Sequence, residues 1–290
     1  MSGVGRHSIE SIFAPPQEMY GTHMLLCGMS ADPIVLESIM EAFTGNVAAT
    51  RRQSANLSGL LLLDASNRII PNSQVPGLLH LQVSAPDNSH WKARTSLLHA
   101  KVALVGFSSV AFATMPELFR LVVSTGNWTS NTFGLDGEID MVWITEAAPN
   151  SKGQDWSDCA AAFQFFDRLL NKLYRSDGKQ GHWLDKWRES LTATGRVPKP
   201  RFIHSLDNTF LKQIKERFPS QGFGILCAGS GFYESKLNAK GSTILSELEK
   251  LGTPKVRYLV VNQKRAGILA TDLGESSAAR WTPCAPKDPL

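Results

Sequence analysis

The residues best suited to chemistry are a histidine and a lysine separated by one alanine, His99-Ala100-Lys101. The surrounding residues 96–107 are rich in leucine and valine and predict a β-strand. Because alternate residues of a strand point to the same face, the imidazole and the ammonium group are expected side by side. An imidazole nitrogen can act as a nucleophile, and a lysine can neutralise phosphate oxygens. The pair is therefore a candidate site for attack on a phosphate group.

A second polar group follows the next expected strand, which runs into Thr125-Gly126-Asn127. The Asn127 amide and the Thr125 hydroxyl can donate hydrogen bonds to phosphate oxygens, and the glycine permits close approach of the backbone. Trp128 is included among the substrate-binding candidates because it could stack on a base or a tyrosine, although a packing role is the favoured interpretation. Taken alone, the histidine would be a structural core residue and the asparagine a turn residue. An unpaired buried lysine is costly, which favours an anion site.

Strands and helices alternate around these candidate residues. Short apolar runs predict the strands, and apolar spacings of three and four predict the helices. Residues 1–22 are expected to form an irregular lead-in. Several of the strands lack polar alternation, which is typical of strands buried on both faces in an α/β sandwich. The expected strands are 24–27, 57–65, 77–85, 96–107, 119–124 and 139–145, and the expected helices are 34–43, 156–174, 182–195 and 205–218.

The C-terminal part of the chain repeats the order of elements found near the start. Residues 222–235 predict a strand and a turn, residues 242–252 a helix, and residues 255–261 a strand. The sequence ILCA in the first of these strands is similar to LLCG near the start of the chain. This order predicts an internal duplication, with one lobe over residues 1–200 and the beginning of a second, incomplete lobe over residues 201–290.

The motif HAK, followed by a strand that ends in TGN, resembles the histidine–lysine signature of the phospholipase D superfamily. Most members carry an aspartate five residues after the lysine, where this chain has Gly106. Loss of that aspartate is similar to the tyrosyl-DNA phosphodiesterase branch. The sequences RLVVSTGNW, IDMVWITEAAP, FFDRLLNKLY and FGILCAGSGF also resemble that branch in their order. The resemblance covers roughly residues 20 to 260 and rests on the ordered set of motifs.

This resemblance implies a phospholipase D-like α-β-α sandwich and a phosphodiesterase that works through a phosphohistidine intermediate. In the family pattern His99 corresponds to the nucleophile, and Lys101 and Asn127 bind the phosphate. Thr125 occupies the hydroxyl position before the asparagine, and Asp140 falls where the family places a polar active-site residue. The implied substrates are DNA ends, for example with 3′-linked adducts, and no metal or cofactor is expected.

Superfamily members use two such motifs, because one histidine attacks and the other protonates the leaving group. The second lobe stops before its own motif, and Asn238-Ala239-Lys240 has the spacing without the histidine. Three explanations stay open: the chain is cut short, a second subunit supplies the other half, or this copy is not catalytic. The alternative functions are a phospholipase D-type nuclease or lipase that is active as a homodimer, and a non-catalytic lobe that binds nucleic acid or a partner protein.

Composition limits the class of protein. The 290 residues are 42% hydrophobic and 19% charged, which is typical of a globular protein. The net charge of +4 permits an anionic partner such as DNA without requiring one. None of the four cysteines lies in a C-x-x-C pair, which argues against a zinc site. The start lacks a signal-peptide layout and the apolar runs are too short to span a bilayer, so an intracellular protein of the nucleus or cytoplasm is expected.

Overall fold

The chain forms two compact units, Met1–Ile203 and His204–Leu290. We describe them from a computed structural model. The described residues are 3–54, 56, 58–83, 98–111, 113–133, 138–170, 182–192, 195–206, 208, 210–217, 225–229, 256–260 and 282–284.

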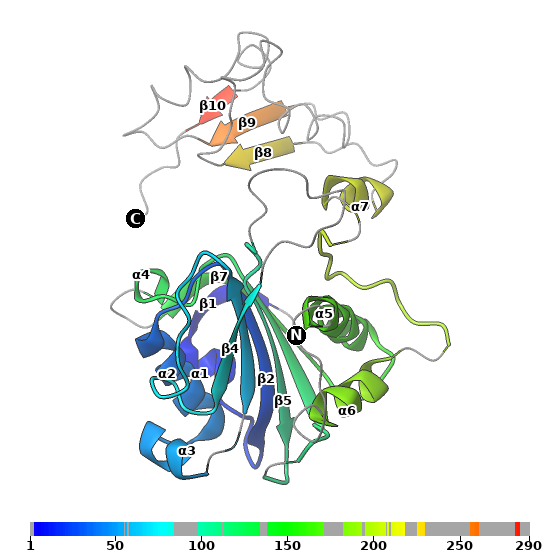
Figure 1. Ribbon diagram of the computed structural model, residues 1–290. Coiled ribbons are helices and arrows are strands. Elements are labelled where there is room, and N and C mark those ends of the chain that lie inside the picture. Colours follow the sequence, from blue (N-terminus) through cyan, green and yellow to red (C-terminus); the bar gives the residue numbers. More distant parts are fainter. Residues whose placement is uncertain are drawn as a thin grey trace. The chain divides into compact units, whose positions relative to one another are not determined.

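The first unit is built on one seven-stranded sheet in the order β1-β7-β6-β5-β2-β3-β4 (Figure 1). Strands β2, β3 and β4 run parallel to one another, and the other neighbouring pairs are antiparallel. The mixed sheet therefore combines a parallel half with an antiparallel half. The bounds are β1 (Gly3–Ser8), β2 (Tyr20–Gly28), β3 (Gly59–Asp64), β4 (Leu78–Val83), β5 (Val102–Ser108), β6 (Leu118–Ser124) and β7 (Glu138–Ala147).

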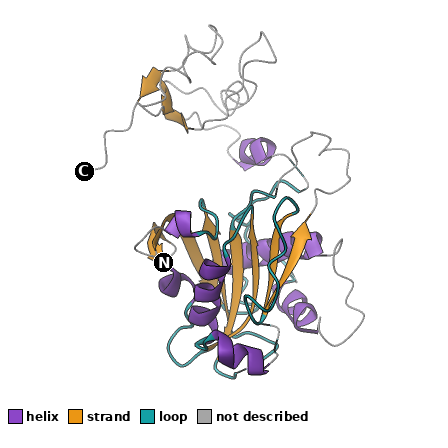
Figure 2. Cartoon of the chain, turned by 60° about the vertical axis from the view of Figure 1, so that its left-hand side comes forward, coloured by secondary structure: helices purple, strands orange, loops and turns teal. Residues whose placement is uncertain are grey.

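Helices cover both faces of this sheet, as Figures 1 and 2 show. On one face lie α1 (Ile9–Phe13), α2 (Pro33–Thr44) and α3 (Ala48–Ser54), and on the other α5 (Gln154–Leu170) and α6 (His182–Leu191). The short helix α4 (Ser130–Phe133) follows β6. The three layers confirm the expected α-β-α sandwich.

The central strands are almost entirely apolar because both of their faces are covered. Every residue of β3 and β5 is buried, as expected for runs such as Leu60 to Leu63. Helix α2 begins with Pro33 in its first turn and ends at Gly45, whose φ of 65° suits glycine. Its buried residues all lie on one face and join the core between α2 and the sheet. They are Val35, Leu36, Ile39, Met40 and Phe43.

The expectation of an irregular lead-in over residues 1–22 is wrong. Strand β1 pairs antiparallel with the edge of β7, and Ser8 caps α1 by accepting a hydrogen bond from the Ser11 N–H at 3.1 Å. The Arg120 guanidinium donates to the carbonyl oxygens of Ile12 at 2.9 Å and Ala14 at 2.8 Å. The register of β1 comes from a strand far along the chain, which local sequence patterns cannot indicate.

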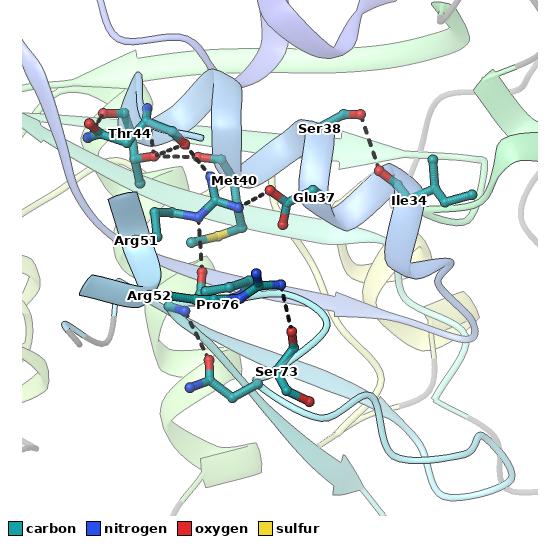
Figure 3. A network of polar contacts seen from close by, with 12 residues as sticks. Ile34, Glu37, Ser38, Met40, Thr44, Arg51, Arg52, Ser73 and Pro76 are labelled. Atoms are coloured by element: carbon teal, nitrogen blue, oxygen red, sulfur yellow. Dashed lines mark hydrogen bonds and ion pairs between the residues drawn. The ribbon is translucent and has the colours of Figure 1, made fainter. Parts of the chain in front are cut away.

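A polar network joins α2, α3 and the loop before β4 (Figure 3). Arg51 is buried, and its guanidinium pairs with Glu37 and donates to the carbonyl oxygens of Asn46 and Pro76. The bond to Pro76 is 3.0 Å long. Arg52 lies beside it and donates to the Ser73 carbonyl at 3.1 Å from an exposed position. One buried guanidinium thus connects three segments of the first unit.

The last segment of the first unit is fastened to α5. Asp158 is completely buried, and its carboxylate accepts hydrogen bonds from the backbone N–H groups of Arg201 and Phe202. The Arg201 side chain also donates to it at 2.7 Å and lies 5.2 Å from the centre of the Trp143 ring. The proline-rich stretch 197–202 therefore runs along the first unit before the second one begins.

In the second unit the structure describes α7 (Phe210–Arg217) and three strands, β8 (Ile225–Gly229), β9 (Val256–Val260) and β10 (Thr282–Cys284). These strands are parallel and lie in the order β10-β9-β8. The expected strands in 222–235 and 255–261 are present, and the expected helix 242–252 lies outside the described residues. The same order of parallel strands occurs in β4-β3-β2, which agrees with the predicted duplication; the duplication itself stays a prediction.

Candidate active site

The candidate residues meet at one edge of the seven-stranded sheet. Cys27, near the end of β2, lies opposite Val102, the first residue of β5, and Val102 lies opposite Val123 of β6. The ends of the parallel strands β2, β3 and β4 therefore lie at the same edge as the start of β5 and the end of β6. This edge carries the HAK segment and the TGN turn.

The HAK segment precedes β5 and is not part of it. The predicted strand 96–107 begins only at Val102 in the structure, and residues 98–101 have irregular backbone. The alternation argument for His99 and Lys101 therefore does not apply. The side chains still meet: the Lys101 Nζ lies 2.9 Å from His99 Nδ1 and 2.9 Å from the His99 carbonyl oxygen. The two side chains meet because the Lys101 side chain folds back onto His99, and not because they share one face of a strand.

The HAK backbone is fixed by contacts with neighbouring strands. The Leu98 N–H donates to the Asp64 carboxylate at 2.8 Å. The Ala100 carbonyl accepts from the Cys27 thiol at 3.6 Å, and burial raises the pKa of that thiol to about 12, so it stays a donor. A short irregular segment is thus held in one conformation.

The end of this segment is tied to the TGN turn. The Lys101 carbonyl accepts from the Ser124 N–H at 2.9 Å. The Ser124 hydroxyl in turn accepts from the Gly126 N–H at 3.0 Å. The residues that carry the two motifs are therefore joined through one serine at the end of β6.

Lys101 is buried, and its charge lies beside the His99 ring, which would favour contact with an anion. Lys101 is only 5% exposed, and in the described part of the chain the hydrogen bonds of its ammonium group all go to His99. Burial lowers the pKa of His99, and the neighbouring Lys101 charge lowers it further. Burial also lowers the pKa of Lys101. The His99 imidazole is therefore neutral at pH 7 beside a cation that lacks a carboxylate partner among the described residues.

The TGN turn presents Thr125 and Asn127 at the same edge. Thr125 is exposed, and the buried Asn127 Oδ1 has no hydrogen-bond partner within the described residues. On its far side the turn is fixed through Asp32, whose N–H donates to the Trp128 carbonyl at 2.9 Å and whose carboxylate accepts from the Ser130 N–H at 2.8 Å. The turn is thus firmly held, and the unpartnered atom is an acceptor, so a phosphate oxygen would have to be bound by the Nδ2 group of the same amide.

Trp128 has the packing role favoured for it and is not placed to stack on a substrate. Trp128 is fully buried, its ring packs edge-on against Phe13 at 5.8 Å, and its indole N–H donates to the Cys27 carbonyl at 2.7 Å. Gly28 allows this packing, because a Cβ there would lie 2.9 Å from the indole ring. Trp128 supports the turn from inside and offers no free face to a ligand.

Gly106 stands where most of the superfamily carries an aspartate, and the structure explains why an aspartate would not fit. A Cβ at this position would lie 2.7 Å from the Trp187 ring and 3.0 Å from Pro116. The Gly106 carbonyl also accepts from the Thr22 hydroxyl at 2.9 Å. Helix α6 packs directly on the backbone of β5 here, which leaves no room for a side chain.

The side chains of two further sequence features, Asp140 and a second H-x-K triplet, lie outside the described part of the chain. Asp140 lies in β7, but its side chain is outside the described part of the chain, so its predicted role stays a prediction. The sequence also holds a second H-x-K triplet, His90-Trp91-Lys92. It precedes the first motif in the same unit and lies outside the described residues, so it is not the missing motif of the second lobe.

Several supporting residues were missed by sequence reasoning. Asp64, Cys27 and Asp32 hold the two motifs in place. Each lies at the end of a strand or at the start of a helix, where such residues are common and the sequence does not indicate their contacts. The one available signal was that a polar residue directly follows the apolar run of β3. Among the described residues there is no group of three or more histidine, cysteine or acidic side chains that could hold a metal ion. No helix in that part of the chain is long and apolar enough to cross a membrane.

Comparisons with solved structures confirm the phospholipase D-like fold. Yeast tyrosyl-DNA phosphodiesterase matches with a TM-score of 0.53 and 11% identity over 94% of this chain and 65% of that chain. A histidine-to-asparagine mutant of the same enzyme matches with a TM-score of 0.51 and 11% identity over 97% of this chain and 66% of that chain. This chain thus spans just under two thirds of the length of its neighbours. No protein-family profile and no curated protein matches the sequence.

Proposed function

We propose that this chain carries one half-site of a phosphodiesterase that acts on DNA ends through a phosphohistidine. His99 is the nucleophile, Lys101 and Asn127 bind the phosphate, and Thr125 contributes its hydroxyl. The observation that carries the proposal is the contact between the Lys101 ammonium and the neutral His99 ring at 2.9 Å. A cation that has no counter-ion among the described residues, beside a nucleophile, suits a phosphate group, which is negatively charged and has an electrophilic phosphorus.

The proposed step uses the lone pair of one imidazole nitrogen. This pair forms a P–N bond while the P–O bond to the leaving group breaks and its electrons stay on the leaving oxygen. Lys101 compensates the negative charge on the phosphate oxygens, and no metal or cofactor takes part. Water then cleaves the P–N bond and restores His99. The leaving oxygen needs a proton unless it is already a stable anion.

The source of that proton is the open part of the proposal. It comes from a second half-site, supplied by a further segment of a longer chain or by a second subunit. DNA as the substrate is supported by the fold shared with yeast tyrosyl-DNA phosphodiesterase and is compatible with the net charge of +4. An intracellular location, in the nucleus or cytoplasm, belongs to the same proposal.

Trapping with an activated substrate tests the nucleophile without the second half-site. A p-nitrophenyl phosphodiester of thymidine releases p-nitrophenolate, which needs no proton. Mass spectrometry after a rapid quench is expected to find the nucleotide on the peptide that contains His99. The adduct should disappear in His99→Ala and persist in His90→Ala, which alters the histidine of the other H-x-K triplet. Failure of the unaltered protein to form any adduct would contradict the proposal.

A binding lobe without catalysis is the second candidate, and the lack of an H-x-K triplet in residues 201–290 favours it. It predicts that inorganic phosphate or single-stranded DNA binds at Lys101 without any adduct on His99. A homodimer that completes its own site is the third candidate. It predicts a dimer by light scattering and turnover that depends on protein concentration.

A further inference from the structure

Asp64 is the last residue of β3 and contacts the backbone directly before His99. The side chain is 5% exposed. Its Oδ1 accepts from the Ser66 N–H at 3.0 Å, and its Oδ2 accepts from the Leu98 N–H at 2.8 Å. In the sheet β2 lies between β3 and β5, so the carboxylate reaches across the end of β2 to the HAK segment.

The carboxylate is charged when it makes these bonds. Burial on its own would raise the pKa of Asp64, but the hydrogen bonds from Ser66 and Leu98 outweigh it and hold the pKa below the ordinary value. Both oxygens are therefore acceptors at neutral pH, and hydrogen bonds to a charged group are stronger than neutral ones.

The position of Asp64 is itself fixed from the other side. The loop after β3 is held by the Asn67 amide, which donates to the carbonyls of Asp64 at 3.1 Å and of Met29. The Gln82 amide donates to the Asn67 carbonyl at 2.5 Å. The carboxylate is thus part of a rigid frame built from the ends of all three parallel strands.

We infer that Asp64 is a positioning residue for His99, acting through the Leu98 N–H. The effect of this positioning on catalysis rests on the proposed function, in which His99 is the nucleophile. Asparagine cannot replace the carboxylate, because it offers one acceptor oxygen where two N–H donors need one each, and its amide group would face the other donor. Loss of the bond leaves the imidazole free to leave the orientation in which it attacks phosphorus, and small errors of orientation slow such a step strongly.

The first test compares Asp64→Asn with Asp185→Asn, which removes an exposed carboxylate paired with Arg188. In Asp64→Asn the Leu98 amide is expected to exchange with solvent at least tenfold faster. Adduct formation on His99 from the p-nitrophenyl diester should slow about ten- to a hundredfold, while the affinity for inorganic phosphate changes less than about threefold, because Lys101 and Asn127 are intact. Asp185→Asn should behave like the unaltered protein. An unchanged adduct rate, or equal losses of rate and phosphate affinity, would overturn the inference.

A second variant guards against misfolding. A backbone ester at residue 98, made by incorporating leucic acid, removes only the donor and leaves Asp64 bonded to Ser66. It should reproduce the slower adduct formation, and a normal rate in a folded ester variant overturns the inference. If the unaltered protein forms no adduct, the proposed function fails by itself. Positioning is then decided by the nuclear Overhauser contact between the His99 ring and the Lys101 side chain, whose persistence in Asp64→Asn would count against it.

Discussion

His99 is suited to attack because two separate effects keep its ring neutral. Burial lowers the pKa of the imidazole, and the charge of Lys101 adds to this effect. A neutral ring keeps a lone pair on one nitrogen, so adduct formation should be independent of pH near neutrality. It should fall in acid, with a midpoint below the ordinary histidine value of about 6.5.

The variant Lys101→Met separates the effect of burial on the pKa of His99 from the effect of the lysine charge. Because burial is the larger cause, the variant should raise the pKa of His99 only part of the way towards 6.5. Titration of the His99 imidazole by NMR measures this value directly and needs no turnover. A pKa that stays unchanged or falls in Lys101→Met would show that the lysine charge does not act on the ring.

His23 gives the stability of the protein a pH dependence, and it lies on the face of the sheet that α6 covers. It stacks on Trp183 with ring centroids 4.6 Å apart, its Nδ1 is unpartnered within the described residues, and burial lowers its pKa to about 4. The folded state binds this proton less readily than the unfolded state, so stability falls as the pH drops from about 6.5 through 4. The loss should reach roughly 3 kcal/mol from this group.

His23→Phe keeps an aromatic ring against Trp183 and removes the titration. Urea unfolding at pH 7.5 and pH 4.5 is expected to show a smaller acid loss for the variant than for the unaltered protein. The two proteins should differ less at pH 7.5, where His23 is neutral in both states. An identical acid loss would rule out His23 as a source of the pH response.

At the residue scale the sequence predicted which candidate residues lie together, but not the residues that hold them in place. His99, Lys101, Thr125 and Asn127 lie at one edge of the sheet, and their catalytic and binding roles stay predictions. Trp128 stayed among the substrate candidates beside its favoured packing role because a tryptophan next to a polar turn gives no local sign of which way its ring faces. Asp64 was missed because its importance depends on a contact with Leu98 across another strand.

At the scale of elements, the Arg51 network holds α2, α3 and the loop before β4 together (Figure 3). Arg51→Met should lower the free energy of unfolding by about 3 kcal/mol, because it leaves Glu37 and two carbonyl groups without their partner. Arg52→Met, which removes a neighbouring exposed arginine, should change it by roughly 0.5 kcal/mol or less. Urea unfolding of both variants measures the difference. Equal effects would mean that the network contributes nothing beyond surface charge.

An element could be predicted from the sequence when its own residues carry the pattern, and not when a distant part of the chain determines its structure. Strands β3 and β6 and helix α2 carry their signal within their own residues, as continuous apolar runs or helical spacing, and were predicted. Strand β1 has no such signal, because its pairing with β7 decides its structure. Residues 98–101 looked like strand because they adjoin β5, but their hydrogen bonds go to Asp64, Cys27 and Ser124 and to the lysine side chain.

At the scale of the whole molecule, the first unit should fold by itself. Its core lies between α1, α2 and the sheet, and its last segment is fastened at Asp158. A fragment of residues 1–203 is expected to unfold cooperatively and to bind inorganic phosphate. A fragment of residues 1–195 lacks the donors for Asp158 and should be less stable by at least about 2 kcal/mol. Calorimetry of both fragments measures this, and equal stability would show that the fastening is dispensable.

The pairing of β1 with β7 also has a consequence for biosynthesis. The ribosome makes Gly3–Ser8 before the other strands of this sheet, yet its partner β7 ends only at Ala147, so this early strand is among the last to dock. Until then the edge of β7 exposes unpaired N–H and C=O groups, which can pair with another chain. A bulky protein fused directly before β1 would prolong this stage, so soluble expression should favour fusion partners joined through a long, flexible spacer.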